Sequence, residues 1–213
     1  MDRLARFEAV TGIIFAAFLA ASIVVSGNTP NSDATGAGVI LFYKANKNSQ
    51  NSSAFWSVLA VVFFVFFGAV LWNRLRRRLA ESPLPAAGLV GVALIAVGGA
   101  IFSSLTFALS DIPDKIDPST AQALNVLNND LFFPFAIGVA VFLIANGLAI
   151  ARGGVLPRWL GWIGIVIGLT APTPLGIIGF FGSGLWVLVA SIIMLVRDLR
   201  STPTPASAAM AAS

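Results

Sequence analysis

Apolar runs about as long as a bilayer is thick recur along this 213-residue chain, and they restrict its fold more than any other feature. A run of about 20 apolar residues is typical of a helix that crosses the roughly 30 Å hydrocarbon core. Six such runs lie at approximately 7–26, 54–73, 84–109, 130–151, 156–172 and 175–196. The sequence therefore predicts an all-α, polytopic membrane bundle with six transmembrane helices, forming a single domain over residues 1–200.

Composition supports the membrane class. The chain is 57% hydrophobic and 10% charged, whereas a soluble globular chain is about 25% charged. The first run follows arginines, as a signal peptide does, but its apolar stretch of about 17 residues exceeds a signal core and no small-x-small cleavage site follows. We expect it to be retained as a helix. The tail STPTPASAAMAAS, residues 201–213, is expected to be disordered.

The chain has neither cysteine nor histidine. This removes disulfides and the usual ligands of zinc, haem and iron–sulfur centres, together with the commonest general base and the Ser-His and Cys-His pairs. The predicted spans also hold essentially no ionisable residue near mid-membrane, since Glu8 and Asp130 fall at span ends. We therefore expect no catalysis, no cofactor and no metal site.

Positive charges are sorted between the two sets of span flanks. All ten arginines fall in one set, at positions 3, 6, 74, 76, 77, 78, 152, 158, 197 and 200. The three lysines, at positions 44, 47 and 115, fall in the other set with most of the aspartates. Short basic loops stay in the cytoplasm, so both termini are expected to be cytoplasmic in a bacterial plasma membrane.

The stretch WNRLRRRLAESP, residues 72–83, concentrates four of these arginines, Arg74, Arg76, Arg77 and Arg78. A nucleic-acid surface would need stacking aromatics or a recognisable module beside the charge. Here the neighbours are a membrane span and a Pro-rich turn. We interpret the cluster as a topology anchor that contacts anionic lipid headgroups, and we expect no nucleic-acid partner.

The predicted spans hold several polar side chains. Their serines and threonines are expected to bond within the preceding helical turn, whereas Trp186 and Asn146 need other partners. Trp186 lies near mid-membrane, where its N–H needs a partner; it either packs in the bundle and bonds a nearby carbonyl, or it lines a cavity. Asn146 is expected to bond across to another helix. Gly164 and Gly168 form a GxxxG pair, which indicates close helix packing within the chain or, alternatively, a homo-oligomer seam.

Two loops on the lysine side are long enough to fold. In the first, Ser32 or Asp33 is expected to cap a short helix, with Val39, Phe42 and Tyr43 on one face towards the membrane surface. Such amphipathic segments would lie on the outer face of the bundle.

In the second loop, Asp117 is expected to cap a helix that begins at Pro118. Its apolar stripe is Ala121, Leu124, Leu127 and Leu131, and its polar residues Gln122, Asn125 and Asn129 face away. Continued to Ala151, this helix would be about 51 Å long, so its start should project from the bilayer with a bend at Pro134. We expect the two loops to form an external roof over a lipid-accessible groove.

The segment VLPRWLGWIG, residues 155–164, follows an ARGG turn, and LFYKANK lies in the first outer loop. Together they resemble a broad group of bacterial, especially actinobacterial, six-helix membrane proteins of unknown function. The resemblance implies the six-span architecture. It implies no activity, substrate or site residue.

The function expected from these features is non-enzymatic. The chain is expected to be an accessory or partner subunit of a membrane assembly, or a binder of an apolar or lipid ligand. The alternative is a small transporter of a lipidic or neutral solute. Its candidate ligand or packing residues are Trp186, Asn146, Asp130 and Tyr43, and its expected partners are membrane lipids and other membrane subunits.

Overall fold

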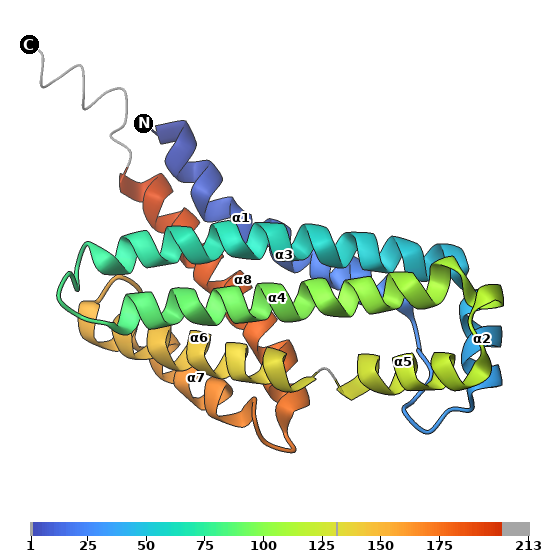
Figure 1. Ribbon diagram of the computed structural model, residues 1–213. Coiled ribbons are helices and arrows are strands. Elements are labelled where there is room, and N and C mark those ends of the chain that lie inside the picture. The colour runs from blue at the N-terminus through green and yellow to red at the C-terminus, as the bar shows by residue number, and fades with distance from the viewer. Residues whose placement is uncertain (1, 131, 202–213) are drawn as a thin grey trace, which may run out of the picture.

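The computed structural model describes residues 2–130 and 132–201, which are helical with no strand in those ranges (Figure 1). The helices are α1 (Asp2–Ser26), α2 (Gly36–Ala45), α3 (Lys47–Arg76), α4 (Leu84–Asp111), the short 3-10 helix η1 (Pro113–Lys115), α5 (Pro118–Asp130), α6 (Phe132–Gly153), α7 (Arg158–Thr170) and α8 (Gly176–Ser201). The all-α class is confirmed. The expectation of a disordered tail over 201–213 lies outside the described residues except at Ser201, which ends α8.

Helix length and hydropathy support a membrane protein. Within the described residues, four segments are long and apolar enough to cross a bilayer: α3, α4, α8 and the stretch Pro118–Gly153 that includes α5 and α6. α7 has 13 residues, about 20 Å at 1.5 Å per residue, which is shorter than the hydrocarbon core. The apolar part of α1 is the 17-residue stretch Val10–Ser26.

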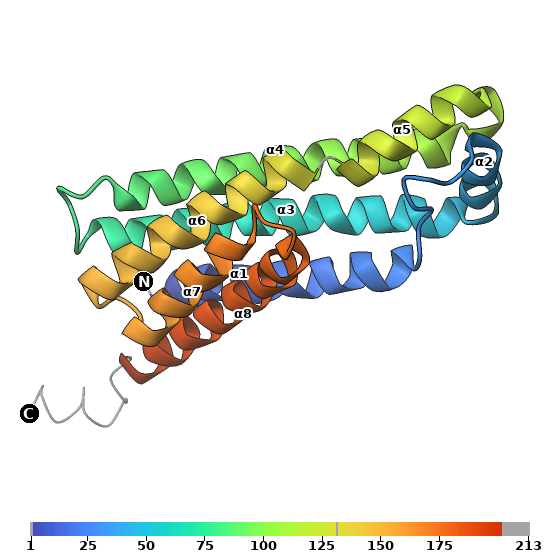
Figure 2. The same cartoon turned by 90° about the horizontal axis from the view of Figure 1, so that it is seen from below.

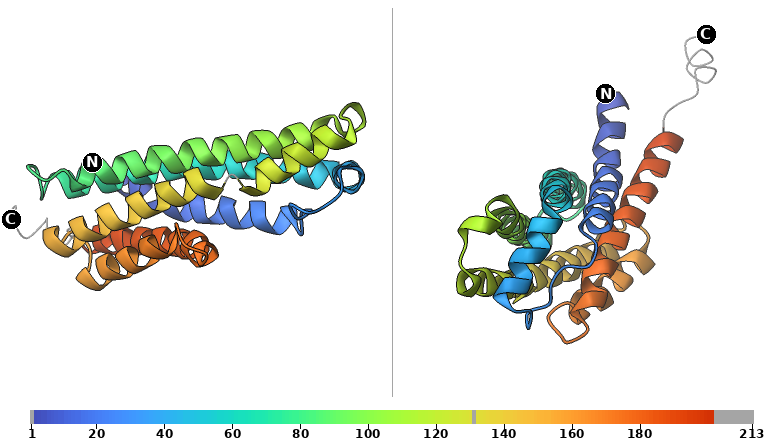
Figure 3. Two further views of the ribbon diagram at one scale, coloured as in Figure 1. Left: turned by 60° about the horizontal axis from the view of Figure 1, so that its bottom comes forward. Right: turned by 90° about the vertical axis from the view of Figure 1, so that its right-hand side faces the viewer.

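Five helices form a closed ring. α1 contacts α3, α3 contacts α4, α4 contacts α6, α6 contacts α8, and α8 returns to α1. α7 packs against α6 and α8 and adds no further member to the ring. Figure 3 shows α1 and α8 leaning together away from α3 and α4.

The two ends of the bundle differ in charge. The start of α1, the end of α3, the start of α4, the end of α6 and the end of α8 lie at one end, on the left of Figure 1. These are the arginine-bearing flanks, and we call this the arginine end. α2, η1 and α5 gather at the opposite, lysine end, where α2 runs transverse to the long helices (Figure 2).

Glycines let the helices approach closely. A Cβ added at Gly91 of α4 would overlap the Phe142 backbone nitrogen and lie 2.7 Å from its Cα. Gly147 of α6 and Gly161 of α7 face each other in the same way, each built Cβ lying 2.5–2.6 Å from the other residue's carbonyl oxygen. Lipid tails offer no hydrophobic drive between helices, so backbone contact of this kind holds such bundles together.

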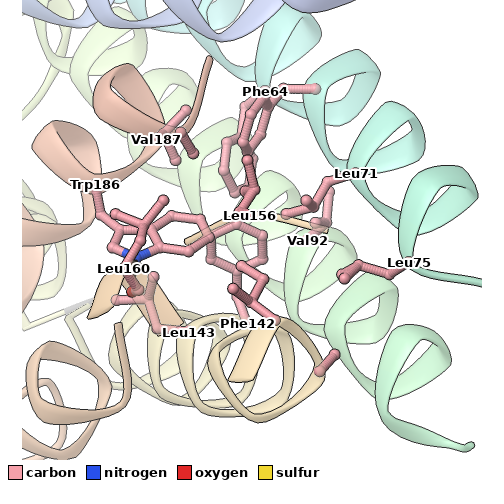
Figure 4. Close-up of a cluster of buried hydrophobic side chains, with 14 of the residues drawn as sticks. Phe64, Leu71, Leu75, Val92, Phe142, Leu143, Leu156, Leu160, Trp186 and Val187 are labelled. Atoms are coloured by element: carbon pink, nitrogen blue, oxygen red, sulfur yellow. Dashed lines mark hydrogen bonds between the residues drawn. The ribbon is translucent and has the colours of Figure 1, made fainter. Parts of the chain in front are cut away.

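The molecule has apolar side chains both inside and outside. Figure 4 shows the interior cluster, in which Phe64, Phe142 and Trp186 meet from α3, α6 and α8. The outer surface carries large hydrophobic side chains that are more than half exposed, among them Phe66, Val97, Val166 and Leu185. A soluble monomer rarely exposes apolar surface on this scale, so the ring is suited to a lipid surrounding.

α2 forms as expected but with a different cap. The N-cap is Thr35, whose side-chain oxygen accepts from the Gly38 N–H at 3.3 Å, so the prediction of Ser32 or Asp33 is wrong. The φ of Thr35 is in the extended region that an N-cap requires. Val39 and Tyr43 are fully buried against Leu109 and Ala121, and this face of α2 therefore covers α4 and α5.

α5 is capped as predicted. The Ser119 and Thr120 backbone N–H groups both donate to Asp117 Oδ1 at 3.0 Å, and Pro118 occupies the first helical position. α5 is described to Asp130 and α6 from Phe132, and residue 131 between them lies outside the described residues. The bend expected at Pro134 stays a prediction.

The predicted inward face of α5 is right in part. Ala121 is buried with Leu124 beside it, and Gln122 and Asn129 are exposed as predicted. Asn125 and Asn128, however, are buried, and Leu127 is 48% exposed; Leu131 lies outside the described residues. Asn125 Nδ2 donates to the Asn31 carbonyl at 2.8 Å, and Asn129 Nδ2 donates to the Pro30 carbonyl at 3.2 Å. The loop before α2 presents backbone acceptors that need donors, and Asn125 therefore turns inward, against the prediction.

Candidate functional site

A cavity of about 350 Å³ lies inside the five-helix ring. Its floor and walls are apolar and include Phe15, Leu19, Ala60, Phe64, Ile95, Phe102, Phe135, Phe142 and Val187. Small side chains and glycines leave this space open, since Gly98 and Gly99 of α4 and Ala60 of α3 stand where larger residues would fill it. The volume falls at the lower end of the range of small-molecule sites, about 300–1,000 Å³.

Most polar residues that line the cavity lie at its lysine-end rim. They are Ser22, Ser26, Ser53, Ser57, Asn128 and Asn129. Ser183 of α8 also lines the cavity, and its Oγ donates to the Phe180 carbonyl at 2.7 Å. Ser53 precedes the floor residue Phe64 by 11 positions on α3, which is about 17 Å along a helix. Polarity therefore changes along the bundle axis, from a hydrogen-bonding rim to an apolar floor.

The serines of the rim join α1 to α3. Ser22 Oγ donates to the Ser53 carbonyl at 3.0 Å, and Ser53 Oγ donates to the Ser22 carbonyl at 2.9 Å. Ser22 Oγ also lies 2.8 Å from Ser57 Oγ. One turn further out, Gln50 Nε2 donates to the Ser26 carbonyl at 2.8 Å. Reciprocal bonds of this kind fix the spacing of the two helices beside the cavity.

Asn128 is the rim residue from α5. It is 8% exposed and lines the cavity, and its Oδ1 accepts no hydrogen bond from the described residues. Its side chain faces the buried hydroxyl of Tyr43 and acts on it, although the pair does not reach full hydrogen-bond geometry. Burial raises the pKa of Tyr43 to about 12, and the Asn128 amide partly offsets this rise. Tyr43 therefore supports the rim from behind and lies outside the cavity lining.

Trp186 lies at the centre of the bundle. Its indole Nε1 donates to the Leu160 carbonyl at 2.8 Å, and its ring meets Phe142 edge to face with centroids 5.7 Å apart (Figure 4). The ring also covers Gly164, where an added Cβ would lie 2.9 Å from Nε1. Trp186 thus packs behind the cavity-lining residue Phe142 and does not line the cavity itself.

Asn146 bonds within its own helix. Its Nδ2 donates to the Phe142 carbonyl at 2.8 Å, four residues back, so the expected bond across to another helix is wrong. The amide instead packs on Gly88 of α4, where a Cβ would lie 2.5 Å from Nδ2. The close approach at this glycine leaves room for the amide only when it folds back along α6.

Gly164 and Gly168 both pack against other helices of the same chain. Gly164 faces Trp186 of α8, and Gly168 faces Ile144 of α6, where an added Cβ would lie 2.9 Å from Cγ1. Both glycines are buried. Their surface serves the packing of α7 against its neighbours, so an oligomer seam would have to use another face.

The arginine cluster divides into two roles. Arg74 forms a bidentate pair with Asp198 of α8, at 3.0 Å (Nη1–Oδ1) and 2.6 Å (Nη2–Oδ2), and so joins α3 to α8. Arg76 stacks over Trp72, 5.0 Å from the ring centroid. Arg77 and Arg78 are exposed. Three of the four predicted headgroup residues thus remain at the surface.

The exposed carboxylate of Asp130 ends α5 and is outside the cavity lining. The sequence prediction also missed the rim, because serines were expected to bond within their own helical turn. A signal was present: Gln50, Ser53 and Ser57 recur at helical spacing and so share one face of α3. Opposite them, Ser22 and Ser26 share one face of α1.

The cavity offers hydrogen bonding and van der Waals contact. Among the described residues that line it, none is Asp, Glu, Lys or Arg. A site of this kind can hold an apolar body and orient one polar group at the rim. Comparison of the chain with protein-family models, with curated proteins and with solved structures found no match.

Proposed function

We propose that the protein is a non-enzymatic, six-span protein of a bacterial plasma membrane that binds an apolar or lipid ligand in the ring cavity. The single observation that carries this proposal is the cavity of about 350 Å³ with an apolar floor and an uncharged polar rim. The arginine end would face the cytoplasm, because basic flanks are retained there. The rim would then open towards the outer leaflet.

Selectivity for one ligand over bulk lipid would come from how closely the ligand fits the cavity and from its hydrogen bonds with the rim. A ligand that leaves the bilayer gains little from the hydrophobic effect, because lipid tails are as apolar as the cavity walls. Its binding free energy must come from tighter packing against rings such as Phe64 and Phe142 and from hydrogen bonds at the rim. A shaped cavity with a polar rim supplies both.

Transport of the same ligand is the second candidate. A transporter needs a route that continues from the cavity floor to the arginine end. Below the floor, Leu71, Leu75, Ile150 and Leu156 are fully buried in one cluster. This packing favours binding over transport.

The proposal is tested by identifying what the protein retains. The full chain is purified from its native membrane in mild detergent, and bound lipids are extracted and measured by mass spectrometry. We expect one compound class to be enriched over bulk lipid at near-stoichiometric amount. In Gly98→Leu the enrichment should be lost, because a Cβ at Gly98 has room, 3.6 Å from Phe135, and the longer side chain would enter the cavity.

Val97→Leu is the matched control, since Val97 is 59% exposed on the outer surface of the same helix. It should retain the ligand as the unmodified protein does. Identical lipid profiles for Gly98→Leu and the unmodified protein would refute binding in the cavity. A protein subunit that co-purifies at constant ratio, without enriched lipid, would support an accessory role in a membrane assembly instead.

A further inference from the structure

The rim is polar but carries no charge among the described residues that line the cavity. The charges at the lysine end lie outside the lining: Lys44 pairs with Asp114 at 2.7 Å and Lys47 with Asp111 at 3.7 Å, and the exposed Asp130 follows the rim residue Asn129. An ion brought into the cavity would lose water and meet no counter-charge in its lining, which is strongly unfavourable. The rim therefore selects against charged headgroups.

The Asn128 carboxamide is the rim group with unused bonding capacity. A carboxamide has two donor hydrogens and one acceptor oxygen. The Asn128 amide acts on the Tyr43 hydroxyl, whereas the Asn128 Oδ1 is buried and accepts no hydrogen bond from a described residue. A buried acceptor without a donor lowers stability unless something binds to it. A ligand hydroxyl can donate to this oxygen.

The serines on the other wall add acceptors. Ser22 and Ser57 already bond each other, at 2.8 Å between their Oγ atoms. Each hydroxyl oxygen has two lone pairs, and Ser57 is only half-buried. A hydroxyl held by Asn128 would find a second partner there.

We infer that the cavity takes an amphiphile with one long apolar chain and an uncharged, hydroxyl-bearing head. The head binds between Asn128 and Ser57, and the chain runs inward to Phe64 and Phe142. This inference rests on the proposed function and names its ligand class. The small volume admits one chain and excludes the body of a two-chain phospholipid.

The test compares probes that share one chain and differ only in the head: dodecanol, dodecane and dodecanoate. The purified full chain in nanodiscs is photolabelled with a dodecanol that carries a diazirine at its far end. We expect dodecanol to compete with labelling at roughly one-tenth of the concentration that dodecane or dodecanoate needs. The label should map to the floor, at Phe64, Phe142 or Val187, and should spare Ser57.

Asn128→Leu removes both polar atoms of the carboxamide at similar size. It should weaken competition by dodecanol about five- to tenfold and leave dodecane unchanged. Gln122→Leu removes another carboxamide, at an exposed position of α5. It should alter competition by neither dodecanol nor dodecane. If Asn128→Leu does not fold, as judged by its thermal transition, Ser57→Ala provides the second variant and should lower the preference for dodecanol over dodecane.

The outcomes separate the two proposals. Equal competition by all three probes, or an unchanged preference in the rim variants, would overturn the hydroxyl-headed ligand and leave the cavity as a binding site. Floor labelling that dodecanoate blocks best would replace it with an acidic amphiphile. Failure of the diazirine-bearing dodecanol to label the floor, with no competition by any of the three compounds, would overturn the inference and the proposed function together.

Discussion

Two glycines on one face of α4 differ in the room that they leave for a side chain. Gly91 and Gly98 are seven residues apart, and both face α6. At Gly91 the neighbour is the Phe142 backbone, which cannot move aside, whereas at Gly98 it is the ring and Cα of Phe135 at ordinary contact distance. The same substitution should therefore have opposite effects at the two positions.

We expect Gly91→Ala to destabilise the protein by about 1–3 kcal/mol, because the added methyl group forces α4 and α6 apart. Gly98→Ala should be neutral or stabilising by up to about 1 kcal/mol, since alanine favours the helix and has room. The stabilities of the two variants are compared by thermal unfolding in detergent, monitored by circular dichroism. Equal losses in both variants would contradict the packing assigned to α4 and α6.

At the scale of elements, α3 and α8 are joined at the arginine end by the Arg74–Asp198 pair. Both side chains are about one-quarter exposed or less, and their geometry is bidentate. A double-mutant cycle with Arg74→Ala and Asp198→Ala should give a coupling free energy of about 1 kcal/mol. Arg77→Ala, at an exposed neighbour, is the control and should change stability little. Zero coupling would remove the pair as a link between the two helices.

The start of α5 depends on the Asp117 carboxylate. Hydrogen bonds from Ser119, then Thr120, hold the pKa of Asp117 well below its usual range. Because the pKa is lowered on folding, the cap stabilises α5 above the unfolded pKa of about 3.9 and is lost as the pH falls below that value towards the folded pKa. The lowered pKa of Asp117 therefore predicts that the cap is intact at neutral pH.

Asp117→Ala should therefore speed amide exchange in the first turn of α5 at neutral pH, and the difference from the unmodified protein should narrow in acid. Hydrogen–deuterium exchange with mass spectrometry measures both. Asp114→Ala, a neighbouring exposed aspartate, is the matched control and should leave that turn unchanged. A difference that persists undiminished well below the unfolded pKa would exclude the carboxylate as the cause.

For the whole molecule, the sharpest prediction concerns orientation. The chain has no cysteine, so a single introduced thiol is the only target for a maleimide. In intact cells, a membrane-impermeant maleimide should label Gln122→Cys, on the exposed face of α5, and should reach Arg77→Cys only after permeabilisation. Labelling of Arg77→Cys from outside would invert the topology and turn the cavity rim towards the cytoplasm.

The sequence by itself determined where the helices are. Apolar length, the Asp117-Pro118 cap and the separation of arginine from lysine are local properties, so each predicted span overlaps a helix and the two kinds of charge lie at opposite ends. Hydropathy also predicted a membrane class, since it depends on composition alone. What it left open was how each helix is turned about its own axis.

That rotation was decided by neighbours distant in sequence. Asn125 faces inward because carbonyls about 95 positions earlier need donors, and Asn146 folds back because Gly88 brings α4 so near. The cavity has the same origin, because it is the space that five helices leave when their glycines and serines set the distances between them. Helix formation is local and can be predicted from sequence, whereas the packing that encloses a binding site depends on contacts that only the assembled chain makes.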